Sequence, residues 1–371
     1  MITDLAKTPF PWFGGKAQAS PAVWAALGDV AHYVEPFFGG GAVLLRRPHP
    51  CNRTYYSETV NDLDGLLVNF WRSVQQDPEA VAHHASWPVS EADLHARHVA
   101  ILRWKADQPL ERLMGDPAWH DPKIAGWWVW GQSSWIGAGW CSGEGPWTVG
   151  DDGVFYRRAR GSSGAGVKRQ RPHLGDNGMG VNHAGTREPG VSRQRPHLTS
   201  NGNGVNHPDT REPGVGEPYH PMTMPELVRW LAFLGARLRH VRILHGDWSR
   251  ACTDGAALTL PVRQGKSPAG VFLDPPYSGE ARVKDLYAHD DHDVAADVRA
   301  WCAEKGGDER YRIVLAGFAG EGHESLVTEH GWREVEWYAG GFLRGGMANQ
   351  GTGGTNQKRE RLWLSPHCLT P

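Results

Sequence analysis

Residues Ala269-Gly270-Val271-Phe272-Leu273 run directly into Asp274-Pro275-Pro276-Tyr277, and this stretch decides the fold that we expect. The apolar run has the length of a strand. It stops at two consecutive prolines, which cannot continue the hydrogen bonding of a sheet. We therefore predict a buried strand over residues 269–273 of a mostly parallel sheet. Open α/β sheets bind their ligands beyond the carboxyl ends of such strands, so the tetrapeptide occupies the position of an active site.

The tetrapeptide suits chemistry on a planar, conjugated amine, whose lone pair is delocalised into the ring. The Asp274 carboxylate and the Pro275 carbonyl can accept the two N–H groups of that amine. This draws the nitrogen toward a tetrahedral geometry and frees its lone pair for attack. Pro276 stiffens the chain at the carbonyl, and Tyr277 can stack on a base that has left its duplex. The structural alternative is a Pro-Pro turn capped by Asp274.

The composition is that of a globular chain. Its 371 residues, 40% of them hydrophobic, are enough for two domains or for one domain with a large insertion. The first residues lack the apolar core of a signal peptide, and no apolar run is as long as a membrane span, so we predict a soluble cytoplasmic protein. The five cysteines are scattered, and we expect reduced thiols. The acidic, His-containing run 289–293 lacks ligand spacing, so we assign no metal.

Glycine-rich segments near the N-terminus predict a cofactor-binding edge. In residues 12–16, two glycines allow a close approach of the main chain to a ligand, and a lysine follows them. A predicted strand over residues 30–36 then enters a glycine turn over residues 37–41, where backbone amides can meet a nucleoside. A second predicted strand, 53–60, leads to Asp62, in the position where such sheets bind ribose hydroxyls. The alternative for the glycine turn is a purely structural turn, and the alternative for Asp62 is a helix cap.

Four segments, in this order, resemble the Dam-type adenine-specific DNA methyltransferases. They are Phe13-Gly14-Gly15-Lys16, Val34-Glu35-Pro36-Phe37-Phe38-Gly39-Gly40-Gly41, Asn61-Asp62-Leu63-Asp64 and Asp274-Pro275-Pro276-Tyr277. In that family the first three surround S-adenosylmethionine, and the fourth is the catalytic tetrapeptide. A predicted strand over residues 241–244 ends near Asp247, which is similar to the family's acidic residue beside the cofactor adenine. The resemblance covers residues 8–75 and 240–365.

The resemblance implies an enzyme that transfers a methyl group from S-adenosylmethionine to the N6 amino group of an adenine flipped out of double-stranded DNA. The implied catalytic residues are Asp274, Pro275, Pro276 and Tyr277. The implied cofactor-binding residues are Trp12, Phe13, Gly14, Gly15, Lys16, Glu35, Pro36, Phe37, Gly39, Gly41, Asp62 and Asp247. We expect direct in-line displacement without a covalent enzyme intermediate. The alternatives are another planar amine, namely cytosine in DNA or adenine in RNA, and a non-catalytic DNA-binding protein on the same fold.

The implied fold is an α/β, doubly wound, Rossmann-like methyltransferase sheet that ends in an antiparallel hairpin. Its remaining strands are expected over residues 310–316, 332–338 and 361–364. We expect residues 1–75 and 221–371 to form the catalytic domain, and residues 76–220 to form an inserted, partly helical target-recognition region. In the insertion, Ser90 and Asp93 have the spacing of a helix cap. Trp127, Trp128, Trp130 and Trp135 fit a buried helical stripe better than a DNA-stacking surface.

A tandem repeat lies within the insertion. Residues 166–189 and 190–213 agree at 18 of 24 positions and contain few apolar residues, so we predict a flexible loop. Residues 153–215 carry ten Lys and Arg but four Asp and Glu, whereas the whole chain has a net charge of −2. We predict that this basic loop contacts DNA phosphates through Arg169, Arg171, Arg193 and Arg195. A functionally neutral expansion is the alternative.

Overall fold

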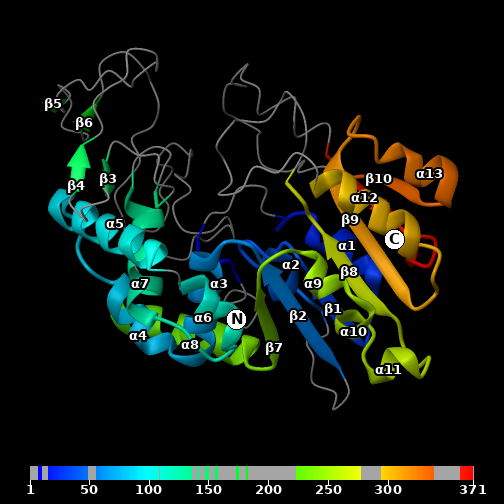
Figure 1. The fold of residues 1–371 in the computed structure, drawn as a ribbon, viewed down its shortest axis with the longest axis horizontal. Helices are drawn as coiled ribbons and strands as arrows, with labels where there is room; N and C mark the ends of the chain where they lie inside the picture. Colours follow the sequence, from blue (N-terminus) through cyan, green and yellow to red (C-terminus); the bar gives the residue numbers. More distant parts are fainter. Residues whose placement is uncertain are drawn as a thin grey trace, which may run out of the picture.

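The computed structural model is drawn in Figure 1. It describes residues 7–10, 16–48, 56–107, 109–135, 140–141, 147–149, 155–157, 173–174, 181–182, 223–276, 294–337 and 360–370.

A seven-stranded sheet forms the centre of the molecule. Its strands lie in the order β10 (Arg333–Glu336), β11 (Glu360–Leu364), β9 (Tyr311–Phe318), β8 (Ala269–Leu273), β1 (His32–Glu35), β2 (Ser57–Asp62) and β7 (Val241–His245). The five strands from β9 to β7 are parallel, whereas β11 is antiparallel to both β9 and β10. The predicted strands and the antiparallel pair near the C-terminus are confirmed, and the sheet is of the mostly parallel α/β type.

Helices cover both faces of the sheet. One face packs against α1 (Ser20–Leu27), α2 (Ala42–Leu45), α3 (Gly65–Gln76) and α8 (Met224–Leu238). The other packs against α9 (Ser249–Cys252), α10 (Asp254–Ala257), α11 (Leu260–Arg263) and α12 (Val294–Lys305). Alternate residues of β8 contribute to the two layers, because Phe272 belongs to the first core and Val271 and Leu273 to the second. This double burial explains why β8 is a continuous apolar run.

Four helices between α3 and α8 form a lobe at the left of Figure 1. They are α4 (Pro78–Ala85), α5 (Glu91–Ala106), α6 (Pro109–Gly115) and α7 (Pro122–Ser134). The predicted cap of α5 is confirmed, since Ser90 Oγ accepts the Asp93 N–H at 3.1 Å. Trp128 and Trp130 are buried, whereas Trp127 and Trp135 are half-buried. Because α4 and α7 pack on α8 and α3, this lobe shares the core of the sheet. The proposed domain boundaries stay a prediction.

Two short strand pairs and one further helix complete the described elements. The strand β3 (Trp147–Val149) pairs with β4 (Phe155–Arg157), and β5 (His173–Leu174) pairs with β6 (Val181–Asn182). The second pair lies in the first copy of the repeat, where the sequence predicts only a loop. The helix α13 (Glu324–His330) lies beside α12 and β10. Across the described ranges, no helix combines the length and the apolar character needed to span a bilayer.

Candidate active site

The strand order reverses between β1 and β8. From β1 the chain builds outward to β2 and β7, and it then returns to β8 and continues in the opposite direction to β9. The register pairs Val34 of β1 with Thr59 of β2 and with Val271 of β8, so β1 lies between these two strands. A reversal of this kind leaves a crevice beyond the carboxyl ends of the adjacent strands, where open α/β sheets bind ligands. The glycine turn after β1 and the tetrapeptide after β8 both begin there.

Asp274 follows β8 immediately and forms an ion pair with Lys16. The distance from Lys16 Nζ to Asp274 Oδ1 is 3.0 Å, and the two side chains are 3% and 19% exposed. Pro275 is buried and Pro276 is half-buried beside them. The structure thus brings a residue expected to hold the cofactor into contact with the candidate catalytic aspartate.

Two further carboxyl groups lie near this ion pair. Glu35 ends β1, and its carboxylate accepts a hydrogen bond from the Tyr33 hydroxyl at 3.0 Å. Burial raises the pKa of the Glu35 carboxyl well above its ordinary value, and the charge of Asp274 acts in the same direction. Glu360 begins β11, and burial raises the pKa of its carboxyl group as well. The charge of Lys16 lowers this pKa, whereas the charge of Asp274 raises it. Sequence reasoning missed Glu360, because its placement follows from the register of β11 beside β9 and not from a local motif.

Hydrogen bonds link the glycine turn to the end of β2. The carboxylate of Asp62 accepts the Gly39 N–H and the Asp64 N–H, each at 2.9 Å. Burial raises the pKa of Asp62 to about 7, although these hydrogen bonds act in the opposite direction. Gly41 has a φ of 70°, and a Cβ there would lie 2.9 Å from the ring of Phe38, so the turn requires glycine at this position. The helix-cap role belongs to Asp64, whose side chain accepts the Leu66 N–H.

Asn61 holds three strand ends together, whereas the sequence analysis named it only within the segment 61–64 and gave it no role of its own. Its side-chain Nδ2 donates to the Pro36 carbonyl at 3.1 Å and to the Gly246 carbonyl at 2.8 Å. The loops after β1 and β7 are therefore both fixed to the end of β2. Among the described residues, its Oδ1 atom is buried and has no hydrogen-bond partner. In the sequence, Asn61 could have been singled out because its amide side chain directly precedes Asp62 at the end of a predicted strand.

Two other candidate cofactor residues lie at the same edge. Phe37 is half-buried and stacks on Trp248, with the ring centroids 6.1 Å apart, which connects the loops after β1 and β7. Asp247 is exposed, and its carboxylate accepts hydrogen bonds from the backbone and the hydroxyl of Ser249. Pro36 is buried at the end of β1. The roles of these residues stay predictions.

Several predicted site residues lie outside the described ranges. They are Trp12, Phe13, Gly14, Gly15, Tyr277, Arg169, Arg171, Arg193 and Arg195. The His-containing run 289–293 lies outside them as well. Within the part of the chain that the structure describes, no group of three or more His, Cys, Asp or Glu side chains could hold a metal ion. Four of the five cysteines are described there, and Cys141, Cys252, Cys302 and Cys368 are free and buried.

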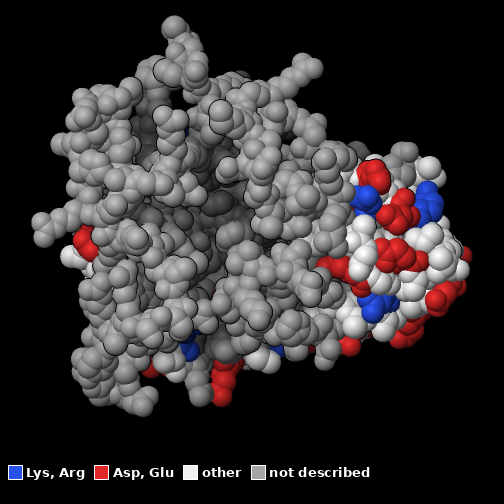
Figure 2. Space-filling model, turned by 90° about the horizontal axis from the view of Figure 1, so that it is seen from above, with Lys and Arg blue, Asp and Glu red and all other residues white. Residues whose placement is uncertain are grey.

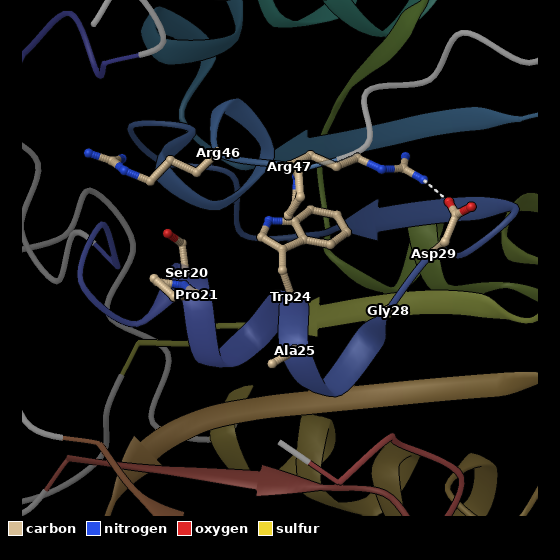
Figure 3. Close-up of a pocket in the computed structure, with 9 residues that line it drawn as sticks. Ser20, Pro21, Trp24, Ala25, Gly28, Asp29, Arg46 and Arg47 are labelled. Carbon is tan, nitrogen blue, oxygen red and sulfur yellow. Dashed lines mark ion pairs between the residues drawn. The ribbon is translucent and has the colours of Figure 1, made fainter. Parts of the chain in front are cut away.

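A surface pocket lies away from this edge. It has a volume of about 460 Å³ and is shown in Figure 3. Its lining consists of Ser20, Pro21, Trp24, Ala25, Gly28, Asp29, Arg46, Arg47 and Pro48. Asp29 precedes β1, so this end of the pocket is at the amino ends of the parallel strands. The Arg47 guanidinium is paired with Glu58 at 3.0 Å and lies 5.3 Å from the centre of the Trp24 ring. None of the predicted site residues that the structure describes lines this pocket.

Comparisons with known proteins agree with the motifs. Residues 12–94 match the family of D12 class N6 adenine-specific DNA methyltransferases. The chain is 28% identical over 78 residues to a DNA N-6-adenine-methyltransferase of Escherichia phage P1, a match that covers 21% of this chain and 10% of the phage protein. Both matches support an adenine N6 methyltransferase family, and they confirm the resemblance that the motifs predicted. The family match includes the glycine turn and Asp62, but it ends before Asp274.

Proposed function

We propose that this protein transfers a methyl group from S-adenosylmethionine to the N6 amino group of adenine in double-stranded DNA, on a Rossmann-like methyltransferase fold. One observation carries the proposal. Asp274, at the carboxyl end of β8, lies at the same reversal of strand order as the glycine turn after β1. The family match to residues 12–94 supports the adenine specificity. The match to the phage relative covers 21% of this chain and 10% of the phage protein, so the proposed activity rests on both lines of support together.

The residues beyond β1 and β2 fit S-adenosylmethionine. The Gly39 to Gly41 turn has no side chains that would keep a ligand from the backbone, and the Asp62 carboxylate is a partly buried acceptor for ribose hydroxyls. Asn61 Oδ1 is a buried acceptor without a partner among the described residues. When bound, this cofactor supplies an electrophilic methyl group on a cationic sulfonium. A cation suits an edge that also carries the carboxylate of Asp274.

Asp274 and Pro275 would act on the target amine. The Asp274 carboxylate accepts one N–H and the Pro275 carbonyl accepts the other, so the nitrogen moves toward a tetrahedral geometry. The carboxylate also stabilises the positive charge that develops on the nitrogen. Because the Asp274 side chain is 19% exposed, an amine can reach it from the crevice. The base must leave the duplex to reach this position.

The test is methyl transfer to duplex DNA by the wild type and by Asp274→Ala, with the methylated nucleosides identified by mass spectrometry after digestion. We expect N6-methyladenine from the wild type, no detectable product from the variant, and similar cofactor affinity in both. Asp297→Ala, on the exposed side of α12, is the matched control and should remain active. A wild type that yields only N4-methylcytosine, or that modifies only RNA, would show a different target. Full activity in Asp274→Ala would remove the tetrapeptide from the active site.

A further inference from the structure

The Lys16–Asp274 ion pair has a geometry that cofactor binding alone does not explain. Lys16 comes from the segment before α1, and Asp274 comes from the end of β8. The Lys16 side chain is almost completely buried, so the segment before α1 and the end of β8 are held together inside the protein. A buried ammonium is stable only when its charge is compensated. Here the compensating group that it contacts at 3.0 Å is the candidate catalytic carboxylate.

The backbone of Lys16 is also fixed. Its carbonyl accepts the Ser20 N–H at 2.9 Å, at the first turn of α1. The ammonium is therefore anchored by the helix at one end and by Asp274 at the other. Because the two oxygens of a carboxylate form one rigid plane, contact with Oδ1 limits the directions in which Oδ2 can point.

The surrounding charges give Lys16 a second effect on Asp274. Glu35 on β1 and Glu360 on β11 both interact electrostatically with Asp274, and Lys16 acts on Glu360 in the opposite direction to Asp274. Without Lys16, three neighbouring carboxyl groups would share one partly buried region. Like charges at short range favour protonation of one of them.

We propose that Lys16 is a positioning residue that orients the Asp274 carboxylate toward the target amine and keeps it ionised, instead of a ligand of the cofactor. This inference rests on the proposed function, because it concerns the group that receives the amine. Lys16, which ends the first glycine segment, thus has a role in the transfer step. The role is indirect, since Lys16 acts through Asp274.

The test compares Lys16→Met and Lys16→Arg with the wild type on duplex DNA at saturating cofactor. In Lys16→Met we expect kcat to fall roughly tenfold or more, because a misdirected catalytic group loses much of its effect. The cofactor Kd should change by less than about twofold, a shift too small to reflect a lost charged hydrogen bond. Lys16→Arg should restore part of kcat. Lys305→Met, which removes a partly exposed ion pair with Asp254 away from the candidate site, is the matched control and should leave kcat unchanged.

The pH dependence separates positioning from a merely structural role. In Lys16→Met, protonation of Asp274 becomes easier, so activity should be lost at a higher pH than in the wild type as the pH falls. An NMR titration of the Asp274 carboxyl carbon gives the same information without turnover, and its midpoint should rise in Lys16→Met. If the wild type methylates no nucleic acid, the proposed function fails, while this titration still tests the effect of Lys16. An unchanged midpoint, or weaker cofactor binding with an intact kcat, would overturn the inference.

Discussion

Asp62 is a carboxyl group on which burial and hydrogen bonding act in opposite directions. Burial favours the neutral acid, while the N–H groups of Gly39 and Asp64 favour the carboxylate, and the resulting pKa is about 7. Its charge therefore changes near neutral pH. A ribose hydroxyl donates a stronger hydrogen bond to a carboxylate than to a neutral acid. At this site, the protonation of one residue should control cofactor binding.

We predict that the affinity for S-adenosylmethionine weakens as the pH falls below about 7, because the proton on Asp62 must leave before the carboxylate can accept the ribose hydroxyls. Above that pH, Asp62→Asn should weaken binding by about 1.5–3 kcal/mol, the contribution of a hydrogen bond to a charged group. The variant should also lose the pH dependence. Titration calorimetry on both sides of this pH measures both effects. A wild-type affinity that does not depend on pH would exclude this role for Asp62.

At the scale of elements, a buried charge cluster joins α2, β2 and α8. Glu58 on β2 is paired with Arg47, which follows α2, at 3.0 Å and with Arg237 of α8 at 2.6 Å. The Glu58 side chain is 2% exposed, so both guanidinium groups depend on a carboxylate that water does not reach. The cluster fixes the helices that cover one face of the sheet. Glu58 and Asp62 belong to the same strand, β2, so the cluster also helps to fix the strand that carries Asp62.

We expect Glu58→Gln to lower the free energy of unfolding by about 3–5 kcal/mol, because it removes the buried carboxylate that pairs with the buried Arg47 and the half-buried Arg237. Chemical denaturation monitored by tryptophan fluorescence measures the change. Glu336→Gln serves as the control, since it removes an exposed ion pair with Arg361 and should cost less than about 1 kcal/mol. If both variants lowered the free energy of unfolding by the same amount, burial of Glu58 would not explain the effect.

The elements that sequence reasoning predicted well are those with local signals. The apolar run of β8, the glycine turn after β1 and the acidic end of β2 can each be recognised within a few residues. The contacts that complete the site are not local. Asn61 bonds to Gly246, 185 positions away, and Glu360 reaches the site only because β11 inserts between β9 and β10. The ion pair between Lys16 and Asp274 likewise follows from the order of strands, which no short motif encodes.

Charge is unevenly distributed over the whole molecule. Residues 294–337, which include α12, α13 and β10, carry nine Asp and Glu but five Lys and Arg. Acidic side chains are prominent on the described surface at the right of Figure 2, the end where these elements lie in Figure 1. The positive surplus lies instead in residues 153–215. An acidic surface repels a nucleic acid, so the binding of DNA should depend on the basic segment.

The last prediction concerns the repeat, residues 166–213. We expect that replacing it with a short Gly/Ser linker weakens non-specific DNA binding and reduces the slope of log affinity against log salt, because fewer phosphates are neutralised. Each lost phosphate contact should lower the slope by about 0.9. Cofactor affinity and the methylated sequence should not change if the helices before residue 161 read the bases.

A variant of full length separates charge from chain length. Changing Arg169, Arg171, Arg193 and Arg195 to Gln keeps the length of the segment but removes four positive charges. If charge is the cause, this variant should reproduce most of the loss of salt dependence that the linker causes, as measured by fluorescence anisotropy with labelled duplex DNA. An unaltered slope in both variants would make the repeat a neutral expansion. A changed methylated sequence in the linker variant would place base recognition within the repeat, because the proposed function assigns cofactor binding and the transfer step to residues outside it.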